Sequence, residues 1–250
     1  MIRHRLATAL LLPTLLSLGC ASNVTAVEDR AATDPWEPMN RSLYKVNSVI
    51  DNATFKPLAK GYKFLLPAFA RRGVTNFSNN LGGPRSIINN LLQGKLHNSA
   101  SEFGRFVINS TFGIGGLLDV TGMGGLPEHE EDFSETFAVW GIPQGPYLMI
   151  PIIGPKTVTD AVAFPLGLQS DPLFTFGESS LRDPINILRL INLRAQLLAA
   201  EGFLDESTDP YITLRESYLQ NREYRIFDGD PPMDDDFYDD MYDDMEDYDE

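Results

Sequence analysis

Hydrophobic positions recur at helical spacing along most of the chain. Within residues 39–50 they are spaced by four, three and four residues, which places them on one face of a helix. The same spacing runs over residues 74–81, stops at "GGPR" (82–85) and resumes from Ile87 to Gly94. An alternation of period two, which would indicate strands, is almost absent. The pattern therefore predicts an all-α fold.

Several helix ends carry sequence signals of their own. Ser99 and Glu102 have the spacing of a capping box ahead of "FGRFVIN". Asp183 and Asp209 are each followed by proline, so each predicts an N-cap and a first helical turn. We expect the helix that begins at Asp183 to end at Gly202, because glycine is a good C-terminal cap.

The connections between the predicted helices are apolar and rich in glycine and proline. They are "FGIGGLLDVTGMGGLP" (112–127), "WGIPQGPYLMIPIIGP" (140–155) and "FPLGLQSDPLFTFG" (164–177). Loops of a water-soluble domain run over its surface and are usually polar. Repeated apolar loops indicate that part of the surface faces something other than water.

The segment 140–155 has no charge and is long enough, together with the preceding "TFAV", to cross a bilayer as a helix. Its four prolines argue against a helix, because each removes a backbone donor. Non-helical backbone at membrane depth must be covered by protein or line a water-filled cavity. We therefore expect an irregular segment at membrane depth, packed on the helices.

Two groups of small residues are candidates for a moving or channel-lining role. Gly141 and Gly145 flank three residues and could be the hinges of a gating loop, since glycine absorbs large backbone changes. Pro146 and Tyr147 continue the same candidate lipid path. The alternative for this loop is a rigid turn shaped by its prolines.

The second group is Gly113, Gly115 and Gly116. These glycines either line and flex a channel or allow helices to pack closely, and the sequence leaves both interpretations open.

The N-terminus indicates export. Basic residues at 3–5 precede an apolar stretch (6–18) that is too short to span a membrane, so residues 1–19 are predicted to be a signal peptide. The single cysteine, Cys20, follows directly and resembles the lipidated cysteine of bacterial lipoproteins. Acylation would anchor the chain, with residues 20–33 as a tether. The alternative is an ordinary cleaved signal with an unmodified cysteine.

The net charge of −15 is concentrated at the C-terminus. Residues 228–250 hold thirteen Asp and Glu residues and no Lys or Arg, so they predict an acidic, disordered tail. A docking segment for a basic partner is the alternative. The body, residues 34–227, is nearly neutral and long enough for a single domain.

Few residues suit catalysis or metal binding. The sequence "HEED" (129–132) lacks the second histidine of a zinc helix, and no G-x-S-x-G motif is present. We therefore predict no catalytic residue, no metal and no cofactor beyond lipid. Arg71 and Arg72 are too small a basic cluster for nucleic acid. With Arg105 they are candidate contacts for lipid headgroups, and surface or structural ion pairing is the alternative.

Five stretches, taken in order, resemble the VacJ/MlaA family of outer-membrane lipoproteins. They are "DPWEPMNRSLYKVN", "GGPRSIINNLLQGK", "RFVINSTFGIGGLLDVTG", "EDFSETFAVWGIPQGPYLMIPIIGP" and "RAQLLAAEGFLDESTDPYITLRESYLQNREY", and the match covers about residues 34–227. One departure is Thr159, since members often carry arginine before the following aspartate.

The resemblance implies a single ring-like helical domain, embedded in one leaflet of the outer membrane on its periplasmic side and bound to trimeric porins. Such proteins of Gram-negative bacteria remove mislocalised phospholipids from the outer leaflet and pass them to a periplasmic lipid-shuttle protein. They are not enzymes. Two alternatives are a porin-associated structural lipoprotein without transport activity and, less in keeping with the sequence, a phospholipase.

Overall fold

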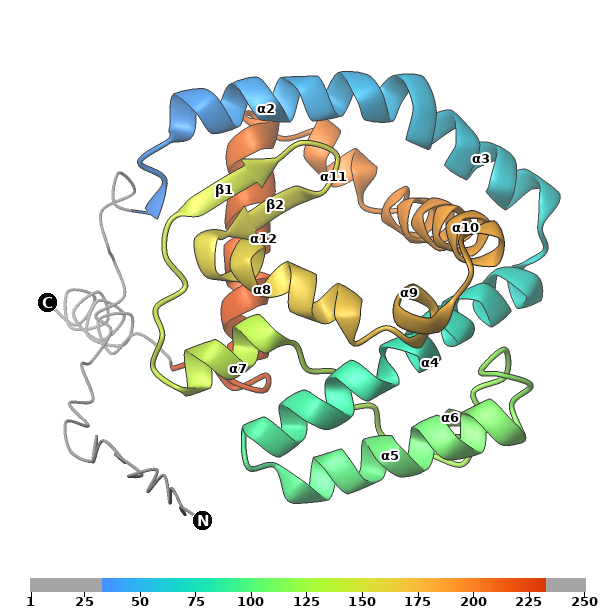
Figure 1. Ribbon diagram of the computed structural model, residues 1–250. Coiled ribbons are helices and arrows are strands. Elements are labelled where there is room, and N and C mark those ends of the chain that lie inside the picture. Colours follow the sequence, from blue (N-terminus) through green and yellow to red (C-terminus); the bar gives the residue numbers. More distant parts are fainter. Residues whose placement is uncertain (1–32, 233–250) are drawn as a thin grey trace, which may run out of the picture.

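The computed structural model of the protein describes residues 33–232. The predicted signal peptide, Cys20 and residues 233–250 of the predicted acidic tail lie outside the described residues. Helices follow one another around the centre of the molecule, so the domain has a ring-like arrangement (Figure 1). The predicted all-α class and ring-like arrangement are confirmed, with one small hairpin as the exception. No helix among the described residues is both long enough and apolar enough to cross a membrane.

The first half of the ring consists of α2 (Glu37–Ile50), the π-helical turn η1 (Asp51–Phe55), α3 (Lys56–Leu65), α4 (Ala68–Leu92) and α5 (Leu96–Thr111). The second half consists of α6 (Val120–Met123), α7 (Phe133–Val139), β1 (Tyr147–Ile150), β2 (Gly154–Thr157), α8 (Val158–Gln169), α9 (Pro172–Phe176), α10 (Ser179–Leu197), α11 (Glu201–Asp205) and α12 (Pro210–Ile226).

Helix α4 runs through the sequence "GGPR", so the predicted break at residues 82–85 is wrong. Pro84 lies inside the helix and removes one backbone donor. The neighbouring α5 explains why the helix continues. A Cβ on Gly83 would lie 3.1 Å from a ring carbon of Phe106, so this glycine lets the two helices approach closely. Tertiary packing therefore outweighs the local signal.

Three of the predicted caps, at Ser99, Asp183 and Gly202, are also wrong. Helix α5 begins at Leu96, and Ser99 lies inside it with its hydroxyl donating to the carbonyl of Ile87 over 2.9 Å. Helix α10 includes Pro184, because it begins at Ser179. It ends at Leu197 rather than at the predicted glycine, and the short helix α11 follows separately.

The cap predicted at Asp209 is confirmed. Its carboxylate accepts hydrogen bonds from the backbone N–H groups of Tyr211 and Ile212 at the start of α12. This signal succeeded because an N-cap is satisfied within its own first turn and needs no distant partner.

The segment 140–155 is only partly irregular. Residues 147–157 form an antiparallel hairpin in which Tyr147 pairs with Thr157 and Ile150 with Gly154, which the sequence analysis missed. Asparagines of α2 hold its edge. The amide of Asn40 donates to the Tyr147 carbonyl over 3.1 Å and accepts from the N–H of Met149 over 2.9 Å. An asparagine amide thus takes the place of a neighbouring strand.

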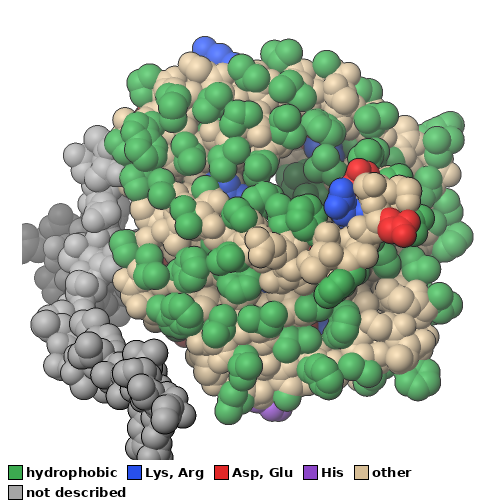
Figure 2. Space-filling model, viewed as in Figure 1, with side chains coloured by type: hydrophobic (Ala, Val, Ile, Leu, Met, Phe, Trp, Pro, Cys, Tyr) green, Lys and Arg blue, Asp and Glu red, His purple; other side chains and the backbone are tan. Residues whose placement is uncertain are grey.

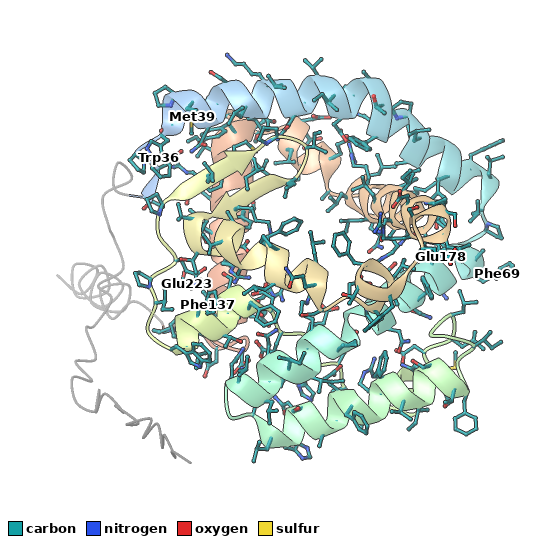
Figure 3. All side chains as sticks on the ribbon, in the orientation of Figure 1. Trp36, Met39, Phe69, Phe137, Glu178 and Glu223 are labelled. Carbon is teal, nitrogen blue, oxygen red and sulfur yellow. The ribbon has the colours of Figure 1, made fainter. Side chains whose placement is uncertain are left out.

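The interior of the ring is polar and its outside is apolar. Among the described residues, seven hydrophobic side chains are buried, against twenty polar or charged ones. Large hydrophobic side chains lie instead on the surface, where Figure 2 shows them spread over the face and rim. Figure 3 shows Trp36, Met39 and Phe69 on the outer edge of the ring. This distribution is the reverse of a water-soluble domain.

Helix α12 carries much of this polar interior. Its inward residues recur at intervals of four, three, four and three, and they are Tyr211, Arg215, Tyr218, Arg222 and Arg225. Arg215 binds the buried Asp34 at the start of the ring over 3.2 Å. Arg222 binds the first turn of α7. The Tyr218 hydroxyl donates to Asp160 of α8. Helix α12 therefore connects the start of the ring, α7 and α8 through polar contacts.

Candidate functional site

Three adjoining cavities line the middle of the ring. The largest, about 730 Å³, lies between α4, the end of α8, α9 and α10. It shares Arg85, Asp171 and Arg189 with a second cavity of about 210 Å³ beside α7. It shares Thr75 and Asn192 with a third, of about 450 Å³, beside α3. The three cavities adjoin through these shared walls, and we refer to them together as the central path. Figure 2 shows a hollow in this face with basic side chains at its edge.

The wall towards α3 is a chain of uncharged polar side chains. The Tyr62 hydroxyl donates to the Asn192 amide oxygen over 2.9 Å, and the Asn192 amide donates to Thr75 over 2.9 Å. Gln196 donates to the same threonine over 3.1 Å. Burial raises the pKa of Tyr62, so its hydroxyl stays protonated. This wall offers hydrogen bonds without a fixed charge.

Basic residues lie along the rest of the path. Arg189 is held by Asp171 at 2.7 Å, and Lys156 by Asp160 at 3.0 Å. Arg85 lines both the largest cavity and the cavity of about 210 Å³, and among the described residues it has no such partner. The sequence analysis missed all three, because an isolated Arg or Lys in a helical pattern reads as a solvent-exposed residue. The path can therefore receive an anionic group among neutral donors.

The structure places two of the candidate arginines on this path. Arg71 and Arg72 line the cavity of about 450 Å³, together with Lys63. A side-chain nitrogen of Arg71 donates to the carbonyl of Lys63 over 3.4 Å. Their role as headgroup contacts stays a prediction, and the cavity wall is a suitable position for it.

Arg105 lies elsewhere. Only 6% of it is exposed, and it donates to the carbonyl of Leu126 over 2.6 Å and pairs with Asp119 over 3.3 Å. It borders a separate polar pocket of about 30 Å³ between α4, α5 and α6. Burial raises the pKa of the nearby Glu102, whose carboxylate accepts the backbone N–H of His129. For Arg105 the structure thus favours the alternative of a structural ion pair, here with Asp119.

The glycines at 113–116 also lie away from the path, at the end of α5. A Cβ on Gly113 would lie 2.2 Å from the carbonyl oxygen of Leu118, and one on Gly116 would lie 2.4 Å from the Asn80 side chain. Gly115 has open space around it but a φ of +69°. These contacts favour close packing, the alternative that the sequence left open.

The candidate gating loop is held at several points. Gly141 and Gly145 have φ values of +83° and +69°, which favour glycine. Thr159 fixes the loop between them, because its N–H donates to the carbonyl of Gln144 and its hydroxyl to that of Pro143. Thr159 is the residue that departs from the family pattern. The contacts favour the rigid turn, and the hinge stays a prediction.

Gln144 is the centre of this loop, and the sequence analysis did not single it out. Its side-chain oxygen accepts hydrogen bonds from Ser134 over 3.1 Å, from Thr157 over 3.4 Å and from Arg222 over 3.4 Å. Gln144 therefore joins α7, the hairpin and α12.

In the rest of the candidate lipid path, Tyr147 belongs to the folded core, and Pro146 is half-buried beside it. The Pro146 carbonyl accepts the N–H of Val158 over 3.0 Å. Tyr147 is fully buried, with its ring edge-on to those of Tyr211 and Tyr218, and burial raises the pKa of its hydroxyl. The structure therefore does not place these two residues on the walls of the central cavities.

Comparison with known proteins gives relatives along nearly the whole body. A family model described as MlaA lipoprotein matches residues 32–225. The chain is 35% identical over 225 residues to the "Intermembrane phospholipid transport system lipoprotein MlaA" of Escherichia coli (strain K12), covering 87% of each chain. It is 32% identical over 229 residues to the protein of the same name from Haemophilus influenzae, covering 88% of this chain and 89% of the relative.

A solved structure gives the same result for the fold. The structure described as "Structural basis for maintenance of bacterial outer membrane lipid asymmetry" has a TM-score of 0.68 and 34% sequence identity. The match covers 77% of this chain and 98% of the other.

Proposed function

Because this chain belongs to the MlaA lipoprotein family, we propose that it is a lipid-anchored protein of the outer membrane that transports phospholipids. In this proposal it removes mislocalised phospholipids from the outer leaflet and passes them to a periplasmic lipid-shuttle protein. The observation that carries the proposal is the inverted ring, which has a polar path inside and an apolar outside.

The two parts of a phospholipid need different surroundings. Its charged headgroup crosses hydrocarbon only at a cost of several kcal/mol or more when it is unpaired. A cavity of about 730 Å³, whose seventeen lining residues include ten polar or charged ones, gives the headgroup a hydrated place. The exposed hydrophobic side chains around the ring let the acyl chains stay in an apolar environment. The ring would lower the barrier without a chemical step, so the proposed activity is passive and not enzymatic.

Three further features of the proposal rest on the family and on the sequence. Acylation of Cys20 would anchor the chain on the periplasmic side of the outer membrane. A trimeric porin would hold the ring in place, and the shuttle protein would receive the lipid. The apolar rim supplies a surface for contact with membrane and porin alike.

A cellular experiment tests the transport. We expect deletion of the gene to raise the amount of phospholipid labelled on the cell surface and to lower resistance to detergent with chelator. The gene for the wild-type chain should restore both. Unchanged surface phospholipid and unchanged resistance would contradict the proposal.

A second experiment separates the alternatives. The protein extracted from membranes should carry phospholipid, as read by mass spectrometry, and should pass it to an acceptor protein. A structural lipoprotein would carry and transfer none, and a phospholipase would release fatty acid. The same spectrum reports acylation of Cys20, for which Cys20→Ala is the control. Normal outer-membrane fractionation of Cys20→Ala would refute the anchor.

A further inference from the structure

The cations along the central path differ in how they are partnered. Arg189 and Lys156 each bind a carboxylate within 4 Å. Arg71 lies at the end of the path beside α3 and is tied to a backbone carbonyl. Among the described residues no hydrogen bond or ion pair involves the guanidinium of Arg85, and its Nε is buried without a partner. An arginine nitrogen shielded from water without a partner is costly.

The position of Arg85 is set by α4 and α8. It follows Pro84, and its carbonyl accepts the amide of Asn89 over 2.8 Å, so its backbone is fixed in the helix. Its side chain crosses to α8, where its Cδ is 3.7 Å from the place of a Cβ on Gly167. A terminal nitrogen lies 3.8 Å from the place of a Cβ on Gly82. The two glycines leave open space around the guanidinium.

The acidic residues near Arg85 are mostly committed to other partners. Asp171 binds Arg189 and caps α9, and Asp160 binds Lys156 and the Tyr218 hydroxyl. Asp132 binds Arg222. Glu130, an exposed residue, also lines the largest cavity. Arg85 thus remains as the cation at the junction of two cavities that is available to an incoming anion.

We propose that Arg85 binds the phosphate group of a phospholipid as its headgroup passes through the ring, an inference that rests on the proposed transport function. The planar guanidinium offers parallel N–H donors that match phosphate oxygens in pairs. The bound phosphate would satisfy the buried Nε. Because Arg85 lines both cavities, it would favour the passage of lipids that carry a phosphate over lipids that lack one.

The test compares two lipids with the same acyl chains. The full-length protein in detergent micelles is titrated with phosphatidylglycerol and with diacylglycerol, which lacks the phosphate. We expect the wild type to prefer phosphatidylglycerol by about tenfold, the size of one charge-assisted hydrogen-bonded contact. Arg85→Gln should lose this preference and bind diacylglycerol as the wild type does. Arg85→Lys should keep part of it, because the charge remains without the paired donors.

The matched control is Arg182→Gln. Arg182 lines none of the three cavities. It pairs with its neighbour Asp183 and lies over the ring of Phe174, so the variant loses the same charge without removing a cation of the cavity walls. It should keep the wild-type preference. Circular dichroism of all variants reports whether each is folded, and Arg85→Lys tests the site if Arg85→Gln does not fold.

The outcomes separate three cases. A wild type that binds neither lipid would contradict the transport function itself. A wild type that binds and transfers lipid, with an unchanged preference in Arg85→Gln, would overturn the role of Arg85 alone. Inorganic phosphate is the third arm. If it binds the wild type but not Arg85→Gln, and phosphatidylglycerol is not preferred over diacylglycerol, the site takes a free anion and the lipid proposal is wrong.

Discussion

Some of the most deeply buried side chains of this protein are charged, whereas many of its large hydrophobic side chains are exposed. Arg215 has only 1% of its surface exposed and shares the carboxylate of Asp34 with the Tyr211 hydroxyl. Burial alone disfavours its charge, but hydrogen bonds to Glu216 and Asp34 raise its pKa. Removing one partner of such a pair leaves the other charged and unpaired in the interior.

Arg215→Ala should therefore destabilise the fold strongly. We expect a loss of about 3–5 kcal/mol in the free energy of unfolding, since Asp34 would remain buried without its cation. Denaturant unfolding in detergent, followed by tryptophan fluorescence, measures it. The control is Arg182→Ala at the surface, with a change within about 0.5 kcal/mol. Equal midpoints for the two variants would show that the buried pair is not a structural tie.

Gly116→Ala tests close packing at the end of α5. The new Cβ would meet the Asn80 side chain at 2.4 Å, and the φ of +94° disfavours any other residue. We expect a loss of about 1–3 kcal/mol in the free energy of unfolding. Gly61→Ala is the control, because this helical glycine has open space around it, and alanine there should stabilise by about 0.5–1 kcal/mol. A stable Gly116→Ala would favour the flexible-channel interpretation instead.

At the scale of elements, α7 is short, and charged side chains fix its first turn. Asp132 and Glu135 form a capping box, and both carboxylates also bind Arg222 of α12. Burial raises the pKa of Glu135, and the neighbouring Asp132 adds to this. For Asp132 burial acts in the same direction, but the hydrogen bonds and charge of Arg222 outweigh it and lower the pKa.

Asp132→Asn should lower stability in a pH-dependent way. A carboxyl whose folded pKa is lowered stabilises the fold above its ordinary pKa of 3.8 and loses this contribution as the pH falls through the folded pKa. We expect the variant to be about 3 kcal/mol less stable than wild type at pH 7. The difference should shrink as the pH falls below about 4, whereas between pH 7 and about pH 4 the protonation of Glu135, whose pKa Asp132 raises, also contributes to it.

Unfolding midpoints measured from pH 7 down to about pH 2.5 check this expectation. Ser180→Ala, an exposed substitution in α10, is the control for general acid effects. A difference that grows as the pH falls below about 4 would contradict the assignment of the ion pair.

At the scale of the whole molecule, the outer surface of the ring is built for an apolar environment. Phe64 is 88% exposed and Phe69 is 77% exposed, and both lie at the corner between α3 and α4. In a water-soluble protein such residues would promote aggregation. Here they belong to an apolar surface, and Figure 2 shows hydrophobic side chains over much of one face of the ring.

The double variant Phe64→Ser/Phe69→Ser should separate membrane association from folding. Made in Cys20→Ala, which lacks the proposed anchor, it should bind phospholipid vesicles more weakly by at least tenfold, because two exposed aromatic side chains no longer insert. Its free energy of unfolding in detergent should change by less than about 1 kcal/mol. Vesicle sedimentation measures the binding. Unchanged sedimentation would show that this corner does not face lipid.

Local signals in the sequence were reliable only where the partners were local. Asp209 was recognised because its carboxylate caps its own helix. The break at "GGPR" and the cap at Asp183 were wrong because packing against neighbouring helices continues α4 and α10 past their prolines. The hairpin was missed because part of its hydrogen bonding comes from α2, through the side chains of Asn40 and Asn47.

The sequence by itself determined the helical class, the apolar surface and the family, because periodicity, composition and ordered motifs do not depend on how the chain closes. Only the tertiary structure decided which polar residues face the central path. Arg85 and Arg105 look alike in sequence. In the folded protein Arg105 pairs with Asp119, whereas Arg85 has no carboxylate partner among the described residues. The wall of the central path likewise depends on contacts between distant parts of the chain, such as that of Tyr62 with Asn192, which are separated by 130 positions. Charge pairing in a polar interior is set by such long-range contacts, which no local pattern encodes.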